Sequence, residues 1–439
     1  MLNKLLAIAS FLTLATLGLA AANPPEALYV HCGKLIYDAS QPPLAPGDVV
    51  IAEGKVQAVG GHLQAPAGAR KLDLSAYTIL PGFVDGHTHL YTGPRDDHPS
   101  DPLAAVRASK DVAYALRLGV VGMRILGTEG FIDVALARAI DEGTIPGPHI
   151  IAAAHAITIP GGHGDFFALP PSLPEHQFYT PLHGFINSPA DAEAAVHLQI
   201  KYGAKVIKIL ASGGVMSPLD SPYAEQVSAE EMKVIVEQAH MANLKVAAHC
   251  ENSRTIHDAL MAGMDSIEHG AGLTSEDADY MRAHGIVLDP TTYIVDSILV
   301  YGEKAHLPDY ILRKGRDLAA KQFAGMKLAM SKGVIIGAGS DMSYAPPEAW
   351  GKKGVLKGTV LDEIIDLVHH GMTPQQALIA GTKTTAALLG LDQVGSIEKG
   401  KEGDFVAVQG DPLSDIHAIE NTKLVVYQGK VVVDHRNGN

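Results

Sequence analysis

Six residues spread along this chain carry side chains that can bind divalent metal ions, and each one ends a short apolar run. They are His87, His89, Lys208, His249, His269 and Asp341. Imidazole and carboxylate ligands suit Zn²⁺, and Mn²⁺, Co²⁺ or Ni²⁺ would also fit them. Because the set exceeds what one tetrahedral ion uses, it predicts a site for two divalent metal ions, with Zn²⁺ expected.

His87 and His89 lie two positions apart, after the apolar segment 79–84. Alternate residues of a strand face the same side, so both imidazole rings can reach one cation. A His-x-His pair alone is weak evidence, because a packed or solvated pair has the same spacing. Here Asp85-Gly86 precedes the pair, and the other candidate ligands follow in order along the chain.

Lys208 lies inside the apolar run 206–210. Lysine is seldom buried in a strand, since an unpaired ammonium group is unfavourable there. A buried salt bridge or a Schiff-base amine would explain it. A carbamate, formed from the amine and CO₂, would instead bridge two metal ions with its two oxygens, and it needs an amine whose pKa is lowered by burial. Because candidate metal-binding histidines accompany Lys208 in the sequence, we favour the carbamate.

His249 and His269 end strand-like segments in consecutive strand–helix units. Either histidine alone would more often be a core residue, but together with the other candidates they are expected to be ligands. Asp341 could cap a helix. As the only acid at the end of the last strand-like run, it is expected to bind metal and to act catalytically, by taking a proton from the attacking water.

Two loop residues are candidates for contact with the substrate. His163 lies in the glycine-rich segment 161–165, where glycines let the backbone approach a ligand closely. Tyr223 follows the segment 212–214, downstream of Lys208. Each could donate a hydrogen bond to a carbonyl oxygen that becomes negative during reaction, so both are expected to be catalytic. An ordinary surface position is the alternative for each.

Eight strand-like runs alternate with helical patterns in the middle of the chain. They end near His89, Leu126, Ile157, Leu210, Cys250, Gly270, Tyr293 and Asp341. The alternation predicts an α/β fold with parallel strands, and eight such units predict a (β/α)8 TIM barrel. All six candidate ligands would then meet at the C-terminal mouth, where such barrels hold their active sites.

The two chain ends show short β-like runs separated by turns. Residues 23–78 and 395–439 are therefore expected to form one small β-sandwich, and residues 79–394 the catalytic barrel. Residues 1–22 combine Lys4 with an apolar stretch and small residues at the end, which predicts a cleavable signal peptide and a periplasmic or secreted protein. A retained membrane anchor is the alternative.

The composition bears on partners and redox state. The net charge is −14 and the longest basic cluster is Lys352-Lys353, so nucleic acid is not an expected partner. No membrane association is expected after signal cleavage. Cys32 and Cys250 could form a disulfide in an oxidising compartment. Their positions in separate strand regions favour two isolated buried thiols.

The motifs resemble the amidohydrolase superfamily over nearly the whole mature chain, and in particular its imidazolonepropionase-like and prolidase-like dipeptidase branch. The matching segments are 81–89, 207–215, 267–270, 339–341, 372–374 and 395–401. The resemblance implies two ligand groups bridged by a carbamate on Lys208: His87, His89 and Asp341 on one ion, and His249 and His269 on the other. Imidazolonepropionase itself uses one metal and lacks the bridging lysine, so Lys208 argues against that activity.

Relatives in this branch remove C-terminal amino acids from dipeptides or N-acyl amino acids, and some similar enzymes hydrolyse ochratoxin. The resemblance implies a homo-oligomeric hydrolase of such small molecules. A bulky or hydrophobic C-terminal residue is expected, since the loops offer apolar surface at Phe166, Phe167, Met216 and Tyr293. The alternative is a mononuclear deaminase or cyclic-amide hydrolase of the same superfamily. Glu251 fits a deaminase poorly, because it is only two residues after His249.

Overall fold

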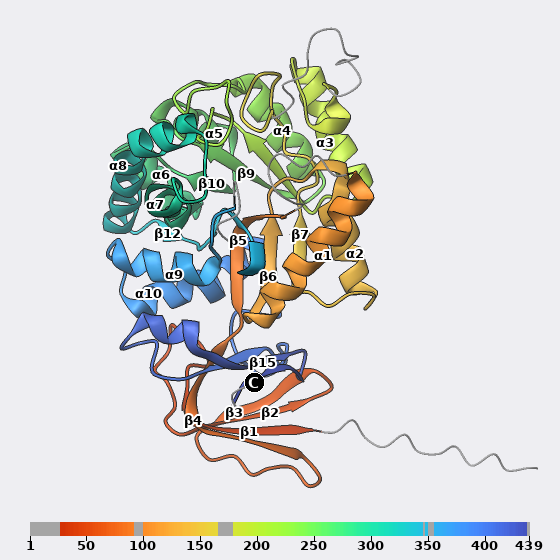
Figure 1. Cartoon of the computed structure of the whole chain (residues 1–439), viewed down its shortest axis with the longest axis vertical. Coiled ribbons are helices and arrows are strands. Elements are labelled where there is room, and N and C mark those ends of the chain that lie inside the picture. The colour runs from red at the N-terminus through yellow and green to blue at the C-terminus, as the bar shows by residue number, and fades with distance from the viewer. Residues whose placement is uncertain (1–26, 92–99, 166–178, 346, 350–354, 437–439) are drawn as a thin grey trace, which may run out of the picture.

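The computed structural model describes residues 27–91, 100–165, 179–345, 347–349 and 355–436. A barrel and a smaller β-rich unit lie one above the other along the long axis of the molecule (Figure 1). The signal peptide predicted for residues 1–22 falls outside the described ranges. Within those ranges, no helix is both long enough and apolar enough to cross a membrane.

Eight parallel strands form the barrel: β5 (Phe83–His89), β6 (Val120–Ile125), β7 (His149–Ala152), β8 (Val206–Leu210), β9 (Lys245–Cys250), β10 (Ser266–His269), β11 (Val287–Asp289) and β12 (Ile335–Ile336). One sheet runs from β5 to β7, with β13 (Met342–Ser343) on β5, and the other from β8 to β12. Backbone hydrogen bonds join the sheets at both seams. Lys205 N donates to Ala152 O at 2.7 Å, and Gly86 N donates to Ala338 O at 2.9 Å. The predicted TIM barrel is confirmed.

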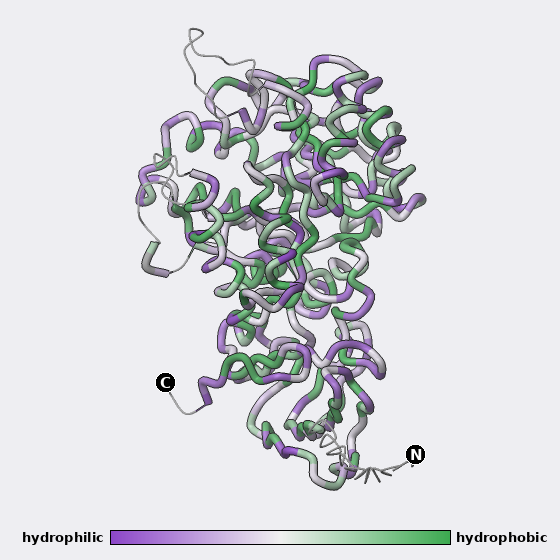
Figure 2. The backbone as a smooth tube through the Cα atoms, turned by 90° about the vertical axis from the view of Figure 1, so that its right-hand side faces the viewer, coloured by the Kyte–Doolittle hydropathy of each residue, from purple (hydrophilic) through white to green (hydrophobic). Residues whose placement is uncertain are grey.

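Helices surround these strands (Figure 1). They are α1 (Asp101–Arg117), α2 (Ile132–Asp141), α3 (Pro189–Tyr202), α4 (Ala229–Met241), α5 (Ser253–Ala262), α6 (Ser275–His284), α7 (Thr292–Tyr301), α8 (Asp309–Lys332), α9 (Val360–His369), α10 (Pro374–Ile379) and α11 (Thr385–Leu389). Because helices cover the strands, β6 and β8 are buried at every position and read as apolar runs. In Figure 2, many hydrophobic segments of the backbone tube lie in the interior, and hydrophilic segments lie mostly at outer turns.

Strands from both chain ends form one β-rich unit, as predicted. Its strands are β1 (Leu28–Leu35), β2 (Gly47–Ala52), β3 (Lys55–Gly60), β4 (Arg70–Pro81), β14 (Phe405–Val408), β15 (Thr422–Tyr427) and β16 (Lys430–Asp434). They make a single seven-stranded sheet in the order β16-β15-β14-β4-β1-β2-β3. The layers expected of a sandwich are thus parts of one sheet.

The sheet curls so that its outer turns meet. Gly403 N donates to Gly54 O at 2.8 Å, and Gly429 N donates to Gly403 O at 3.1 Å. The curl encloses a separate apolar core that includes Leu74 and Phe405. Since β4 leads directly into β5, this unit lies at the N-terminal end of the barrel strands, opposite their C-terminal mouth.

Two further expectations concern this architecture. Cys32 in β1 and Cys250 in β9 are both buried and free, so the favoured pair of isolated thiols is confirmed. The predicted domain boundaries after residues 78 and 394 remain predictions. Strand β4 itself continues past residue 78 to Pro81.

Candidate metal centre

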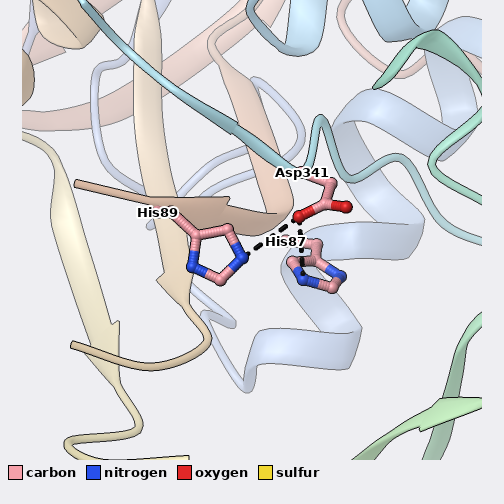
Figure 3. A group of neighbouring side chains, drawn as sticks. All are labelled: His87, His89 and Asp341. Atoms are coloured by element: carbon pink, nitrogen blue, oxygen red, sulfur yellow. Dashed lines mark ion pairs between the residues drawn. The ribbon is translucent and has the colours of Figure 1, made fainter. Parts of the chain in front are cut away.

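All six predicted ligands come from barrel strands or the segment that follows β12, and one group of three is already in ligating geometry. Asp341 Oδ1 lies 3.4 Å from His87 Nε2 and 3.1 Å from His89 Nε2. Figure 3 shows the three side chains pointing toward one another. One nitrogen from each ring and one carboxylate oxygen lie close enough together to hold a single ion.

The second predicted group lies beside the first. The ring of His269 is centred 5.2 Å from that of His87 and 4.5 Å from that of His249. His269 Nδ1 is 4.0 Å from Asp341 Oδ2. The structure therefore brings the two histidines of β9 and β10 next to the ligands of β5.

Hydrogen bonds determine which nitrogen of each ring remains available. The partners are Glu268 Oε2 for His87 Nδ1 (2.9 Å), Thr291 Oγ1 for His269 Nδ1 (2.7 Å) and the Gly213 carbonyl for His249 Nε2 (3.0 Å). A partner on one nitrogen fixes the tautomer and leaves the other nitrogen as a ligand. Burial, helped by nearby positive charge, lowers the pKa of all three rings well below the usual value, which favours the neutral form that metals bind.

Lys208 fits the bridging role. Its side chain is 1% exposed, and its Nζ has no hydrogen-bond partner among the described residues. Burial also lowers the pKa of this amine. A desolvated amine with no partner is suited to reaction with CO₂. The two oxygens of the resulting carbamate would then be able to bind metal ions. The donor set thus fits two metal ions bridged by a modified lysine.

A cavity opens at this cluster. It is lined by His163, His249, His269, Asp341, Glu251, Gln322, Val215, Met216, Ile294, Val295 and Ile298. His163 stacks on the ring of His249, with centroids 4.4 Å apart, and its Nδ1 lies 2.6 Å from Ser217 Oγ. The structure therefore brings this predicted residue to the metal ligands. Burial and the charge of Asp341 raise the pKa of Glu251 well above its usual value.

Tyr223 is placed differently from His163. Its side chain is 44% exposed, and its hydroxyl donates to the Asp317 carbonyl at 3.3 Å. Tyr223 is not among the residues that line the cavity. Of the apolar loop residues expected near the substrate, Met216 lines the cavity and Tyr293 does not, while Phe166 and Phe167 lie outside the described ranges.

Comparison with known proteins agrees with this geometry. Residues 78–432 match the model of the amidohydrolase family. The chain belongs to this family. Ochratoxinase of Aspergillus niger is 29% identical over 436 residues, which cover 94% of this chain and 87% of that protein. This amidohydrolase is thus an enzyme that hydrolyses peptide or amide C–N bonds.

Two solved structures are also similar to this amidohydrolase. A Xaa-Pro dipeptidase with methionine bound in its active site has a TM-score of 0.83 and 28% identity, and the match covers 93% of this chain and 100% of that chain. A prolidase complexed with N-methylphosphonate-L-proline has a TM-score of 0.82 and 26% identity, with the same coverage. The predicted superfamily and its prolidase-like branch are confirmed.

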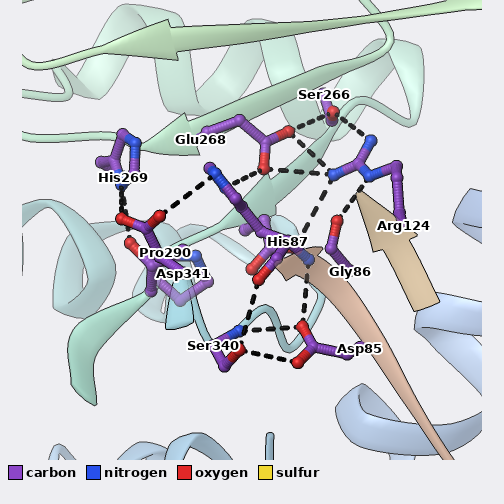
Figure 4. Close-up of polar contacts among 12 residues, drawn as sticks. Asp85, Gly86, His87, Arg124, Ser266, Glu268, His269, Pro290, Ser340 and Asp341 are labelled. Carbon is purple, nitrogen blue, oxygen red and sulfur yellow. Dashed lines mark hydrogen bonds and ion pairs between the residues drawn. The ribbon is translucent and has the colours of Figure 1, made fainter. Parts of the chain in front are cut away.

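The amidohydrolase also contains a buried ion pair that supports His87 and that was not predicted from the sequence. Arg124 Nη2 donates to both oxygens of Glu268, at 2.9 and 3.1 Å, and Nη1 donates to Ser266 Oγ at 3.1 Å. Glu268 in turn contacts His87 Nδ1 (Figure 4). Arg124 and Glu268 are charged residues inside buried strands, the same signal that marked Lys208.

The backbone at two candidate ligands is unusual. His269 and Asp341 have φ angles of 69° and 51°, a left-handed conformation that non-glycine residues seldom adopt. Such residues persist where the surrounding structure holds them, and they gather at functional sites. At Asp341, the backbone N–H donates to the His87 carbonyl at 2.7 Å. Gly339 is required nearby, because a Cβ there would lie 2.5 Å from both Asp289 Oδ2 and His87 Cβ.

Proposed function

We propose that this amidohydrolase binds two divalent metal ions and cleaves the amide bond to a C-terminal amino acid, in dipeptides or N-acyl amino acids. The observation that carries the proposal is the buried amine of Lys208, which has no hydrogen-bond partner among the described residues. The amine lies close enough to the candidate ligands to influence the pKa values of His87, His249, His269 and Asp341. The names of the relatives support the substrate class. One is an ochratoxinase, and the solved structures hold methionine and a proline phosphonate.

The proposed ligands divide as the sequence resemblance implies: His87, His89 and Asp341 for one ion, His249 and His269 for the other, and a carbamate on Lys208 between them. When bound, the two ions, expected to be Zn²⁺, would polarise the substrate carbonyl and acidify the attacking water. The carbamate forms when the Lys208 amine adds to CO₂ and releases one proton.

Asp341 is the proposed proton carrier. Burial opposes its ionisation, but His87 and His89 hold the pKa of its carboxyl group below the usual value. The carboxylate can therefore take a proton from the attacking water and return it to the nitrogen of the leaving amino acid as the C–N bond breaks. His163 would donate a hydrogen bond from Nε2 to the carbonyl oxygen, since its Nδ1 already contacts Ser217.

The first test is metal content. Elemental analysis of zinc-loaded, active protein should find two metal ions per chain, because one ion cannot use both ligand groups. Protein stripped with a chelator should regain activity only when two equivalents have been added. Full activity with one equivalent would contradict the binuclear site and favour a mononuclear one.

The second test is substrate preference. A dipeptide ending in phenylalanine should be hydrolysed faster than its C-terminal amide and faster than one ending in lysine, in each case by roughly tenfold or more. The reason is the apolar lining of Val215, Met216, Ile294, Val295 and Ile298. Preference for the amide would exclude carboxylate recognition, and preference for lysine would exclude an apolar pocket. Export and a homo-oligomeric state stay part of the proposal, to be checked by fractionation and light scattering.

A further inference from the structure

One cavity residue has no role in the chemistry described so far. Glu251 is 5% exposed, lines the cavity, and its Oε2 has no hydrogen-bond partner among the described residues. Its backbone N–H donates to Ser212 Oγ at 2.9 Å, which fixes the residue after β9. The other carboxylate oxygen, Oε1, lies 3.9 Å from His249 Nε2, but that nitrogen is engaged with the Gly213 carbonyl.

Three other buried acids near the site have a charged or hydrogen-bonding partner. Glu268 is paired with Arg124, and Asp85 accepts hydrogen bonds from Ser340 and Tyr344 at 2.7 Å each. Asp289 accepts no hydrogen bond among the described residues, but its Oδ2 lies 3.8 Å from Arg124 Nη2. An uncompensated carboxylate in a buried place is unfavourable unless a cation or donors approach it. Glu251 Oε2 therefore lies in the cavity without a partner among the described residues, where a group that enters from outside can reach it.

The protein itself does not supply that partner within the described residues. No lysine or arginine lines the cavity there. The nearby Lys314 is already held by the carbonyls of Gly214 and Ser217, at 3.0 and 2.8 Å, and by Asp220 Oδ1 at 2.8 Å. No cationic side chain that lines the cavity is therefore available to pair with Glu251 Oε2, which leaves this oxygen open to a cationic group of the substrate.

We propose that Glu251 binds a positively charged nitrogen of the substrate, an inference that rests on the proposed function. Two substrate groups have this chemistry: the free α-ammonium of a dipeptide, and the side chain of a lysine or arginine. The α-ammonium is the better fit, because it is attached one carbon from the scissile carbonyl, and Glu251 flanks His249 at the metal ligands. The enzyme should then favour dipeptides over N-acyl amino acids, whose acylated nitrogen carries no charge.

The test compares four substrates with zinc-loaded wild-type and Glu251→Gln enzyme: Ala-Phe, N-acetyl-Ala-Phe, Ala-Lys and N-acetyl-Ala-Lys. Wild-type enzyme should prefer free dipeptides by about 10- to 100-fold in kcat/KM, and Glu251→Gln should remove most of that preference through KM. If Glu251→Gln loses the preference for Ala-Phe over N-acetyl-Ala-Phe, Glu251 binds the α-ammonium. If it instead loses a preference for N-acetyl-Ala-Lys over N-acetyl-Ala-Phe, Glu251 binds the side chain. An equal change for all four substrates overturns the proposal.

Two controls separate recognition from folding. Glu251→Gln should unfold at the same or a higher temperature than wild type, since it replaces a buried acid whose Oε2 lacks a partner by an amide of the same shape. A lower unfolding temperature would indicate a structural role for the carboxyl group instead. Glu251→Asp keeps the charge and should retain part of the preference. If wild-type enzyme cleaves none of the four substrates, the proposed function fails. If it cleaves them and the variant keeps the same ratios, only the role of Glu251 fails.

Discussion

Replacing Lys208 by arginine should abolish hydrolysis and remove most of the bound metal. Arginine stays protonated and cannot add CO₂, so a permanent cation would stand where the bridge belongs. Since the side chain is 1% exposed, solvent cannot screen that charge from the histidines around it. We expect kcat/KM to fall by more than about 10³-fold, because the metal ions supply several kcal/mol of transition-state stabilisation. Metal analysis and kinetics on the same sample measure both effects.

A matched control is Lys245→Arg, also on a barrel strand. Lys245 Nζ donates to the carbonyls of Ala387 and Leu388, at 3.0 and 2.7 Å, away from the cavity, so activity should stay near normal. Lys208→Ala should lose activity but recover part of it when short carboxylates that can bridge the ions are added. An arginine variant at position 208 with two metal ions and near-normal turnover would rule out the carbamate.

Asp341→Asn should lower kcat by about 10²- to 10⁴-fold, the usual range for removal of a general base, and further if metal is lost. Asparagine is a fair probe, because it tolerates the left-handed backbone that Asp341 adopts at φ 51°. The carboxyl pKa of Asp341 is below its usual value, so wild-type activity should persist through mildly acidic pH and fall only as this carboxylate becomes protonated.

Three measurements check the role of Asp341. In the variant, the pH profile of turnover should no longer show the titration of this carboxyl group. Metal analysis of the variant separates loss of the base from loss of a ligand. The surface substitution Asp392→Asn, on an exposed residue, should leave turnover unchanged. An Asp341→Asn enzyme with two metal ions and a wild-type rate would place the base elsewhere.

The barrel and the positions of the candidate metal ligands could be predicted from the sequence for the same reason. Parallel strands buried on both faces leave short apolar runs, and a polar residue such as His249 or Asp341 at the end of each run points to the C-terminal mouth. Which strands pair is not visible in such runs. The pairing of β14 with β4 joins residues from opposite ends of the chain, for example Phe405 with Pro81, so a single curled sheet could not be told from a sandwich.

Side-chain partners were harder to predict than positions. Arg124 and Glu268 meet across the barrel interior, and finding that pair requires the register of β6 and β10 rather than the pattern of either strand. Loop residues depend on conformations that periodicity does not encode. Thus His163 is drawn to the ligands by its contact with Ser217, whereas Tyr223 turns its hydroxyl to a backbone carbonyl near the surface.

The shared β-rich unit has a consequence for how the protein is made. A ribosome completes β4 early and β14 only near the end of translation, after every strand of the barrel. Until then one edge of β4 has no neighbour, and an open strand edge invites pairing with another chain. A polypeptide that stops short of Phe405 keeps that strand edge exposed. Incomplete molecules therefore differ from finished ones by an unpaired, aggregation-prone edge that chaperones and proteases can recognise.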